Sequence, residues 1–135
     1  MKDLITFTHL IHGKSFFEAL AASVENWEDL LDSREQPSFD DAWISNFKTL
    51  QGISYQEPNN EANVTVLREF AFKEMFRLTA DAEIAGYISD DIGLLAEALA
   101  KGHLTTWCEK LLARLPIWAF PVLAEVFWSD IRLIE

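Results

Sequence analysis

Cysteine is nearly absent from this 135-residue chain, because Cys108 is the only one. A single cysteine excludes a disulfide within the chain and is typical of proteins in a reducing compartment. Basic residues are also scarce: 11 Lys and Arg stand against 22 Asp and Glu, which gives a formal net charge of -11. This imbalance argues against direct binding to nucleic acid or to an anionic membrane surface, since both rely on cationic side chains.

The sequence also lacks a long apolar run. The most apolar stretch, LPIWAFPVLAEVFW at 115–128, is too short to span a bilayer and contains Pro116, Pro121 and Glu125. No small-residue cleavage site follows the N-terminal stretch MKDLITFTHLIHGK, so we expect no signal peptide. Together with the lone cysteine, these features predict a cytoplasmic protein that does not bind membranes.

Apolar residues are abundant and regularly spaced. Half of the residues are hydrophobic, and through most of the chain they recur at positions three and four apart, the pattern of helices that bury one face. Only GISYQ, at 52–56, alternates in the manner of a strand. No repeat or interdomain linker is visible. We therefore predict an all-α fold: a single compact domain, 1–135, of about six to eight helices.

Capping residues and breakers predict where the first helices begin and end. Ser15 and Glu18 have the spacing of a capping box, which starts a predicted helix over 16–33. Pro37 and the acidic residues after it predict the start of a second helix, whose apolar residues form a stripe on one face. Gly52 and Pro58 predict a long connection over 51–63. The stripe after Pro37 contains Phe39, Trp43, Phe47 and Leu50.

The second half of the chain shows further helix starts. A helix is expected from about Val64, followed by a short one capped by Thr79. Ser89 or Asp90 is then predicted to cap a helix beginning near Asp91. Pro121 is suited to the first turn of a last helix.

Candidates for catalysis or metal binding are few. His9 and His12 would share a helix face, but zinc needs three or four ligands, and neither a cysteine pair nor an H-E-x-x-H pattern accompanies them. Asp90 and Asp91 would project about 100° apart on a helix, so they do not form an obvious catalytic pair. Cys108 has the surroundings of a core thiol. We predict no catalytic residue, no metal, no cofactor and no enzymatic activity.

Carboxylates gather in two stretches without Lys or Arg, one between Lys14 and Arg34 and one between Arg77 and Lys101. Like charges three or four apart on a helix cost about 0.2–0.5 kcal/mol each, so helix stability gives no reason for this pattern. A solvated surface that serves only solubility is the alternative. We predict a partner-binding surface made of acidic residues: Glu25, Glu28, Asp29, Asp32, Asp40, Asp41, Asp81, Glu83, Asp90 and Asp91.

In its small size, strong acidity, helical pattern and lack of catalytic motifs, the chain resembles bacterial immunity proteins. These are antitoxins of contact-dependent growth inhibition and similar secreted-toxin systems. The resemblance implies that the chain binds a cognate basic toxin domain, for example a nuclease, and blocks its activity; it assigns no individual site residue. Two alternatives stay open: a nucleic-acid mimic that inhibits a host DNA-binding enzyme, and a small helical enzyme that uses His9 and His12.

Overall fold

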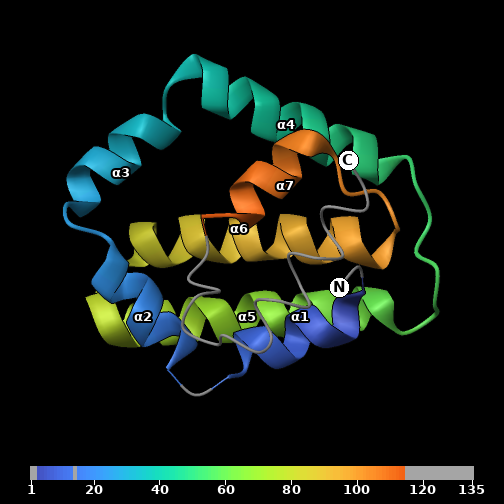
Figure 1. Ribbon diagram of the computed structural model, residues 1–135, viewed down its shortest axis with the longest axis horizontal. Helices are drawn as coiled ribbons and strands as arrows, with labels where there is room; N and C mark the ends of the chain where they lie inside the picture. The colour runs from blue at the N-terminus through green and yellow to red at the C-terminus, as the bar shows by residue number, and fades with distance from the viewer. Residues whose placement is uncertain (1–2, 14, 115–135) are drawn as a thin grey trace.

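The computed structural model describes residues 3–13 and 15–114 of the chain (Figure 1). Within these ranges the chain forms seven α-helices and no strand, which confirms the predicted all-α fold. The helices are α1 (Leu4–Ile11), α2 (Phe16–Ser23), α3 (Trp27–Arg34), α4 (Pro37–Gln51), α5 (Asn60–Thr79), α6 (Ala82–Ala100) and α7 (Thr106–Leu112).

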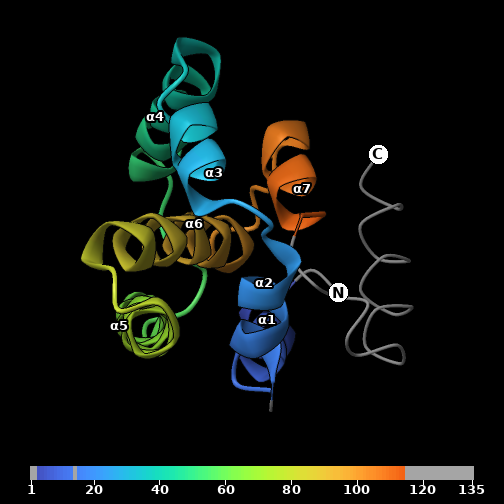
Figure 2. The same cartoon turned by 90° about the vertical axis from the view of Figure 1, so that its left-hand side faces the viewer.

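Helix α6 lies at the centre of the molecule. Figures 1 and 2 show α5 antiparallel to α6 on one side, with α1 and α2 beside α5, whereas α3, α4 and α7 lie on the other side of α6. Of the 19 residues of α6, 13 are buried. A helix covered around most of its circumference is apolar on nearly every face. The few polar side chains of α6 are therefore held firmly in place by the packing around them.

Two residues of α6 place Arg68 of α5. A Cβ at Gly93 would collide with the present position of the Arg68 side chain, so the absence of a side chain there leaves room for the arginine to lie across α6. One turn earlier, the Ser89 hydroxyl donates a hydrogen bond of 2.8 Å to the Arg68 carbonyl oxygen. These two contacts fix the register between the helices and set Arg68 beside Asp90.

The prediction of one helix over 16–33 is wrong, because the chain forms two helices there. Ser15 has a φ of 78°, in the left-handed region, and its side chain makes no capping hydrogen bond. The predicted capping box is therefore absent. Its second member, Glu18, instead accepts a hydrogen bond of 2.8 Å from Arg77 on α5.

The break between α2 and α3 follows a local capping signal. Val24 and Asn26 have extended backbone, and the Asn26 side chain accepts a hydrogen bond of 3.1 Å from the Asp29 backbone N–H. Asparagine is among the strongest N-cap residues. The apolar spacing that runs from α2 through Val24 to Trp27 obscures this second start in the sequence.

The predicted boundary at Ser89 and Asp90 is also wrong, because α6 is continuous through both. Its cap is Asp81, whose carboxylate accepts hydrogen bonds of 2.9 and 3.1 Å from the backbone N–H groups of Glu83 and Ile84. Thr79, the predicted cap, donates its hydroxyl to a carbonyl inside α5. Aspartate is favoured at caps, but tertiary partners can hold it in a helix interior, and here they do.

Other boundaries agree more closely with the sequence patterns. Helix α4 begins at Pro37, in the first-turn position that suits proline, and the connection over 52–59 separates it from α5. Helix α5 begins at Asn60, somewhat before the predicted start near Val64. The last helix predicted from Pro121 lies outside the described residues. None of α1–α7 is both long and apolar enough to cross a membrane.

The apolar core is formed chiefly by α1, α2, α5, α6 and α7. Helices α3 and α4 contribute less to it, since their only buried residues are Arg34 and Leu50. Four of their apolar residues pack against the core while only partly buried: Trp27, Leu31, Phe39 and Trp43. Polar contacts with α6 add to this packing. The largest fully buried side chains include Phe7, Phe16, Phe17, Leu67, Met75 and Leu95.

Candidate protein-interaction surface

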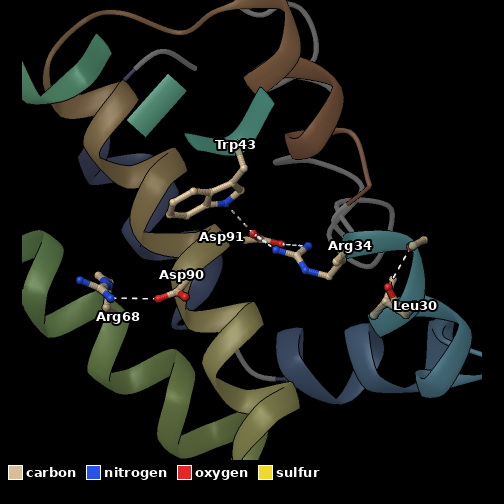
Figure 3. A network of polar contacts seen from close by, with 7 residues as sticks. Leu30, Arg34, Trp43, Arg68, Asp90 and Asp91 are labelled. Atoms are coloured by element: carbon tan, nitrogen blue, oxygen red, sulfur yellow. Dashed lines mark hydrogen bonds and ion pairs between the residues drawn. The ribbon is translucent and has the colours of Figure 1, made fainter. Parts of the chain in front are cut away.

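Asp91 is buried and joins two other helices to α6. Its two carboxylate oxygens accept hydrogen bonds from the Arg34 guanidinium, and one of them also accepts a bond of 3.1 Å from the Trp43 indole N–H (Figure 3). Arg34 is the last residue of α3, and Trp43 lies in α4. A single carboxylate thus fixes α3 and α4 on α6.

The surroundings of this ion pair exclude a partner from it. The Arg34 guanidinium carbon lies 4.7 Å from the centroid of the Phe39 ring and 5.1 Å from that of Tyr87. Burial raises the pKa of the Asp91 carboxyl, while its contacts with Arg34 and Trp43 act in the opposite direction. Because its oxygens are buried and already paired, Asp91 cannot belong to the predicted partner-binding surface.

Asp90 has a different environment. Its carboxylate lies 3.0 Å from Nη2 of Arg68, and both side chains are about half exposed, at 49% and 51%. In Figure 3, Asp90 points toward α5, whereas Asp91 points toward α3 and α4. The two carboxylates therefore do not share a site. This agrees with the expectation that they form no catalytic pair.

The structure separates the acidic residues predicted for the first stretch. Glu28, Asp29 and Asp32 lie on α3, but Glu25 precedes that helix, so these four residues do not share one helix. Asp81 is only partly exposed, because it caps α6. The exposed members of the predicted set are Glu25, Glu28, Asp29, Asp32, Asp40, Asp41, Glu83 and Asp90.

Tyr87 connects α6 to the segment just after α3. Its hydroxyl lies 3.4 Å from a carboxylate oxygen of Glu35. Glu35 is exposed and follows Arg34, so it lies just outside the first acidic stretch and outside the predicted set. The contact joins the end of α3 to the second acidic stretch, in which Tyr87 lies.

Two adjoining hollows beside α4 share Trp43 and Asp90, and together they form what we call the α4 cleft. The larger hollow, about 240 Å³, lies between α4 and the α5–α6 pair. Besides the two shared residues, its lining includes Phe47, Tyr55, Glu61, Arg68 and Glu97. The smaller, about 180 Å³, includes Asp40, Ile44 and Tyr87.

Apolar side chains of α4 remain exposed at this cleft. Ile44 is 38% exposed and Phe47 is 39% exposed. The ring of Phe47 stacks on that of Trp43, with 5.6 Å between centroids and 17° between planes. The spacing along α4 predicted a core-facing stripe that contains both aromatics. Trp43 does pack against the core, whereas Phe47 is exposed. An exposed aromatic side chain stacked on a neighbouring ring is a favourable anchor in a protein interface.

The histidine pair gives no support for a metal site. His12 stacks on Phe70, with ring centroids 4.2 Å apart, and its Nδ1 lies 3.0 Å from the Thr8 carbonyl oxygen. In the part of the chain that the structure covers, no three potential ligands gather as a metal site would require. Cys108 is buried, and burial raises the pKa of its thiol, as expected for a structural cysteine.

The fold is that of a small acidic all-α protein whose exposed aromatic and carboxylate side chains meet at one cleft. Residues 6–122 match the family described as Immunity protein PIM1. The match spans most of the chain, and the chain therefore belongs to this family of immunity proteins. No curated protein shows a significant match to it.

Proposed function

We propose that the protein neutralises a cognate toxin by binding to it and blocking its activity. The observation that carries the proposal is the family match, which extends over residues 6–122. We further propose that the toxin domain is basic, as many nucleases are, and that the immunity protein acts without catalysis in the cytoplasm. The formal net charge of -11 supports a basic partner, because opposite charge accelerates encounter between proteins.

The exposed acidic side chains of α3 support the proposal that the partner is basic. Glu28, Asp29 and Asp32 are all exposed, whereas Arg34, the one basic residue of that helix, is buried against Asp91. The outer surface of α3 is therefore more acidic than its sequence suggests. Such a surface would attract a basic toxin domain before the closer contacts form.

The direct test uses the toxin domain encoded beside the immunity gene. We expect co-expression to restore growth of toxin-producing cells, and the two purified proteins to form a complex of fixed stoichiometry. Normal growth inhibition in the presence of the folded protein would contradict the proposal. Retention of a DNA-binding host enzyme in place of the toxin would favour nucleic-acid mimicry.

The electrostatic part has a separate test. Charge reversal of Glu28, Asp29 and Asp32 should slow association with the toxin and flatten the dependence of the association rate on salt, while helical content stays unchanged. An association rate equal to that of the unmodified protein from low to high salt would show that this surface serves solubility only.

A further inference from the structure

The protein holds two of its own cations by the same combination of groups. Arg34 pairs with Asp91 and lies against the rings of Phe39 and Tyr87. Lys101 lies 3.0 Å from a carboxylate oxygen of Glu97, and its Nζ is 4.5 Å from the centroid of the Tyr55 ring. A carboxylate and an aromatic face together suit an arginine or lysine side chain well.

A third set of the same groups lies in the α4 cleft. The stacked rings of Trp43 and Phe47 line the larger hollow together with Glu61 and Asp90. Among the described residues, no cation lies over this ring pair. The aromatic surface therefore lacks the basic side chain that the other two sets already hold.

Charge and size further define the missing group. Three carboxylates line the larger hollow, those of Glu61, Asp90 and Glu97. Asp90 pairs with Arg68 and Glu97 with Lys101, so the carboxylate of Glu61 leaves the hollow with a net negative charge. Its volume of about 240 Å³ is below the range of roughly 300–1,000 Å³ that is usual for small-molecule pockets. A single long basic side chain fits this description better than a cofactor does.

We propose that the α4 cleft receives an arginine or lysine side chain of the toxin, with the aliphatic stem on Trp43 and Phe47 and the charged end at Asp90 and Glu61. This inference rests on the proposed toxin-binding function and adds the site and the chemistry of recognition. Arg68 occupies the rim in the unbound protein. Its ion pair with Asp90 is half exposed and therefore weak, so a cation from the toxin competes with it for the same carboxylate.

The test measures the affinity of the toxin domain for two cleft variants, each with a matched control. Phe47→Ala should weaken binding by roughly 30-fold, as for an interface anchor, whereas Phe76→Ala should leave binding unchanged. Phe76 is a good control because it is also exposed, at 46%, but lies on α5 outside the cleft. Glu61→Gln should weaken binding by about 5-fold, and Glu69→Gln on the same helix should not.

A third variant, Arg68→Gln, identifies the charge of the occupant by the sign of its effect. It removes the resident competitor for Asp90, so a cationic occupant should bind about 3-fold to 5-fold more tightly. If the cleft instead received an acidic side chain, loss of Arg68 would weaken binding. Circular dichroism and thermal unfolding of each variant establish that it is folded before its affinity is compared.

The outcomes separate this inference from the proposed function. If the unmodified protein fails to bind the toxin domain, the proposed function fails and the inference falls with it. If the unmodified protein binds but the folded Phe47→Ala and Glu61→Gln variants bind equally well, the cleft inference alone is overturned. Weaker binding by Arg68→Gln would overturn the assignment of a cation.

Discussion

The helices on the two sides of α6 differ in how deeply they are buried. On one side, α1 and α5 pack against α6 with α2 beside α5, and fully buried apolar residues such as Phe7, Phe17 and Leu67 fill the interior. On the other side, α3 and α4 bury only Arg34 and Leu50 completely, and their other apolar contacts with the core are partly buried. We call α3 and α4 together the α3–α4 arm.

Polar contacts hold this arm at defined points. Besides the Arg34–Asp91 pair, Nζ of Lys101 donates a hydrogen bond of 2.6 Å to the Leu50 carbonyl oxygen at the end of α4. The Thr105 hydroxyl, just before α7, donates a bond of 2.7 Å to the side-chain oxygen of Asn46. Fully buried apolar packing thus dominates on the α5 side, while on the arm side directional bonds add to partly buried apolar contacts.

The difference has a functional meaning. A helix that buries its apolar face in the core cannot offer that face to a partner. Because α4 is only partly buried against the core, its exposed Ile44 and Phe47 remain available for binding. The comparison can be tested by substitutions that act on one side of α6 or on the other.

The largest effect on the arm is expected from Arg34→Met. It leaves the buried Asp91 carboxylate without its cation, which should lower the free energy of unfolding by about 3–5 kcal/mol. The double variant Arg34→Met, Asp91→Leu should recover most of this loss, because no buried charge remains. Chemical denaturation checks both. A loss below about 1 kcal/mol for the single variant would show that the pair is not what holds the arm.

A smaller effect is expected from Trp27→Ala at the start of α3. Trp27 continues the apolar spacing that runs from α2, and if it were fully buried its replacement by alanine would cost about 3–5 kcal/mol. Trp27 is only partly buried against the core, so we expect a loss of about 1–2 kcal/mol. Phe7→Ala on the α1 side, with 0% exposure, provides the reference and should cost about 3–5 kcal/mol. Equal losses for both variants would remove the proposed difference between the two sides.

The helix caps give the next test. Asn26→Ala should cost about 1 kcal/mol, since it removes the cap of α3. A capping role would give Asp90→Ala a cost near ~1 kcal/mol as well. We expect a smaller cost, because Asp90 lies inside α6 and makes only a half-exposed ion pair. Equal losses for the two variants in thermal unfolding would indicate that Asp90 acts as a cap after all.

The smallest effect concerns the tyrosines on the arm side. Burial, followed by the nearby Glu97 carboxylate, raises the pKa of Tyr55 to about 12, and burial and Glu35 raise that of Tyr87. Their contribution to stability should be complete below the unfolded pKa of about 10 and should be lost as pH rises through the higher folded values. Ultraviolet titration should show both tyrosines ionising at higher pH than an exposed tyrosine, with Tyr55 ionising near pH 12. A single normal transition at about pH 10 would place both hydroxyls in open solvent.

The sequence predicted the presence of the helices better than the contacts between them. Three-and-four spacing identified the buried face of α5, where Leu67, Ala71 and Met75 are indeed buried. The same spacing led to the prediction of one helix in place of α2 and α3. Apolar periodicity continues across the break and does not reveal a one-residue cap such as Asn26, so helix ends are predicted less well than helices.

The candidate site was harder to predict, because it depends on contacts between distant residues. Asp91 resembles an exposed first-turn residue in the sequence, and only its pairing with Arg34 from α3 shows that it is buried. Phe47 has the spacing of a core residue, but no element covers it fully in the described part of the chain. Both errors arise from tertiary packing, which the order of residues along one helix does not reveal.

The bonds that hold the α3–α4 arm also imply an order of folding. Arg34 and Asp91 are 57 positions apart in the sequence, and Trp43 and Asp91 are 48 apart, whereas α5 and α6 are consecutive helices. Contacts between distant positions form only after the loop-closure entropy has been overcome. We therefore expect α5 and α6 to pair early and the arm to dock late, so that the destabilising variant Arg34→Met raises the unfolding rate more than it lowers the folding rate.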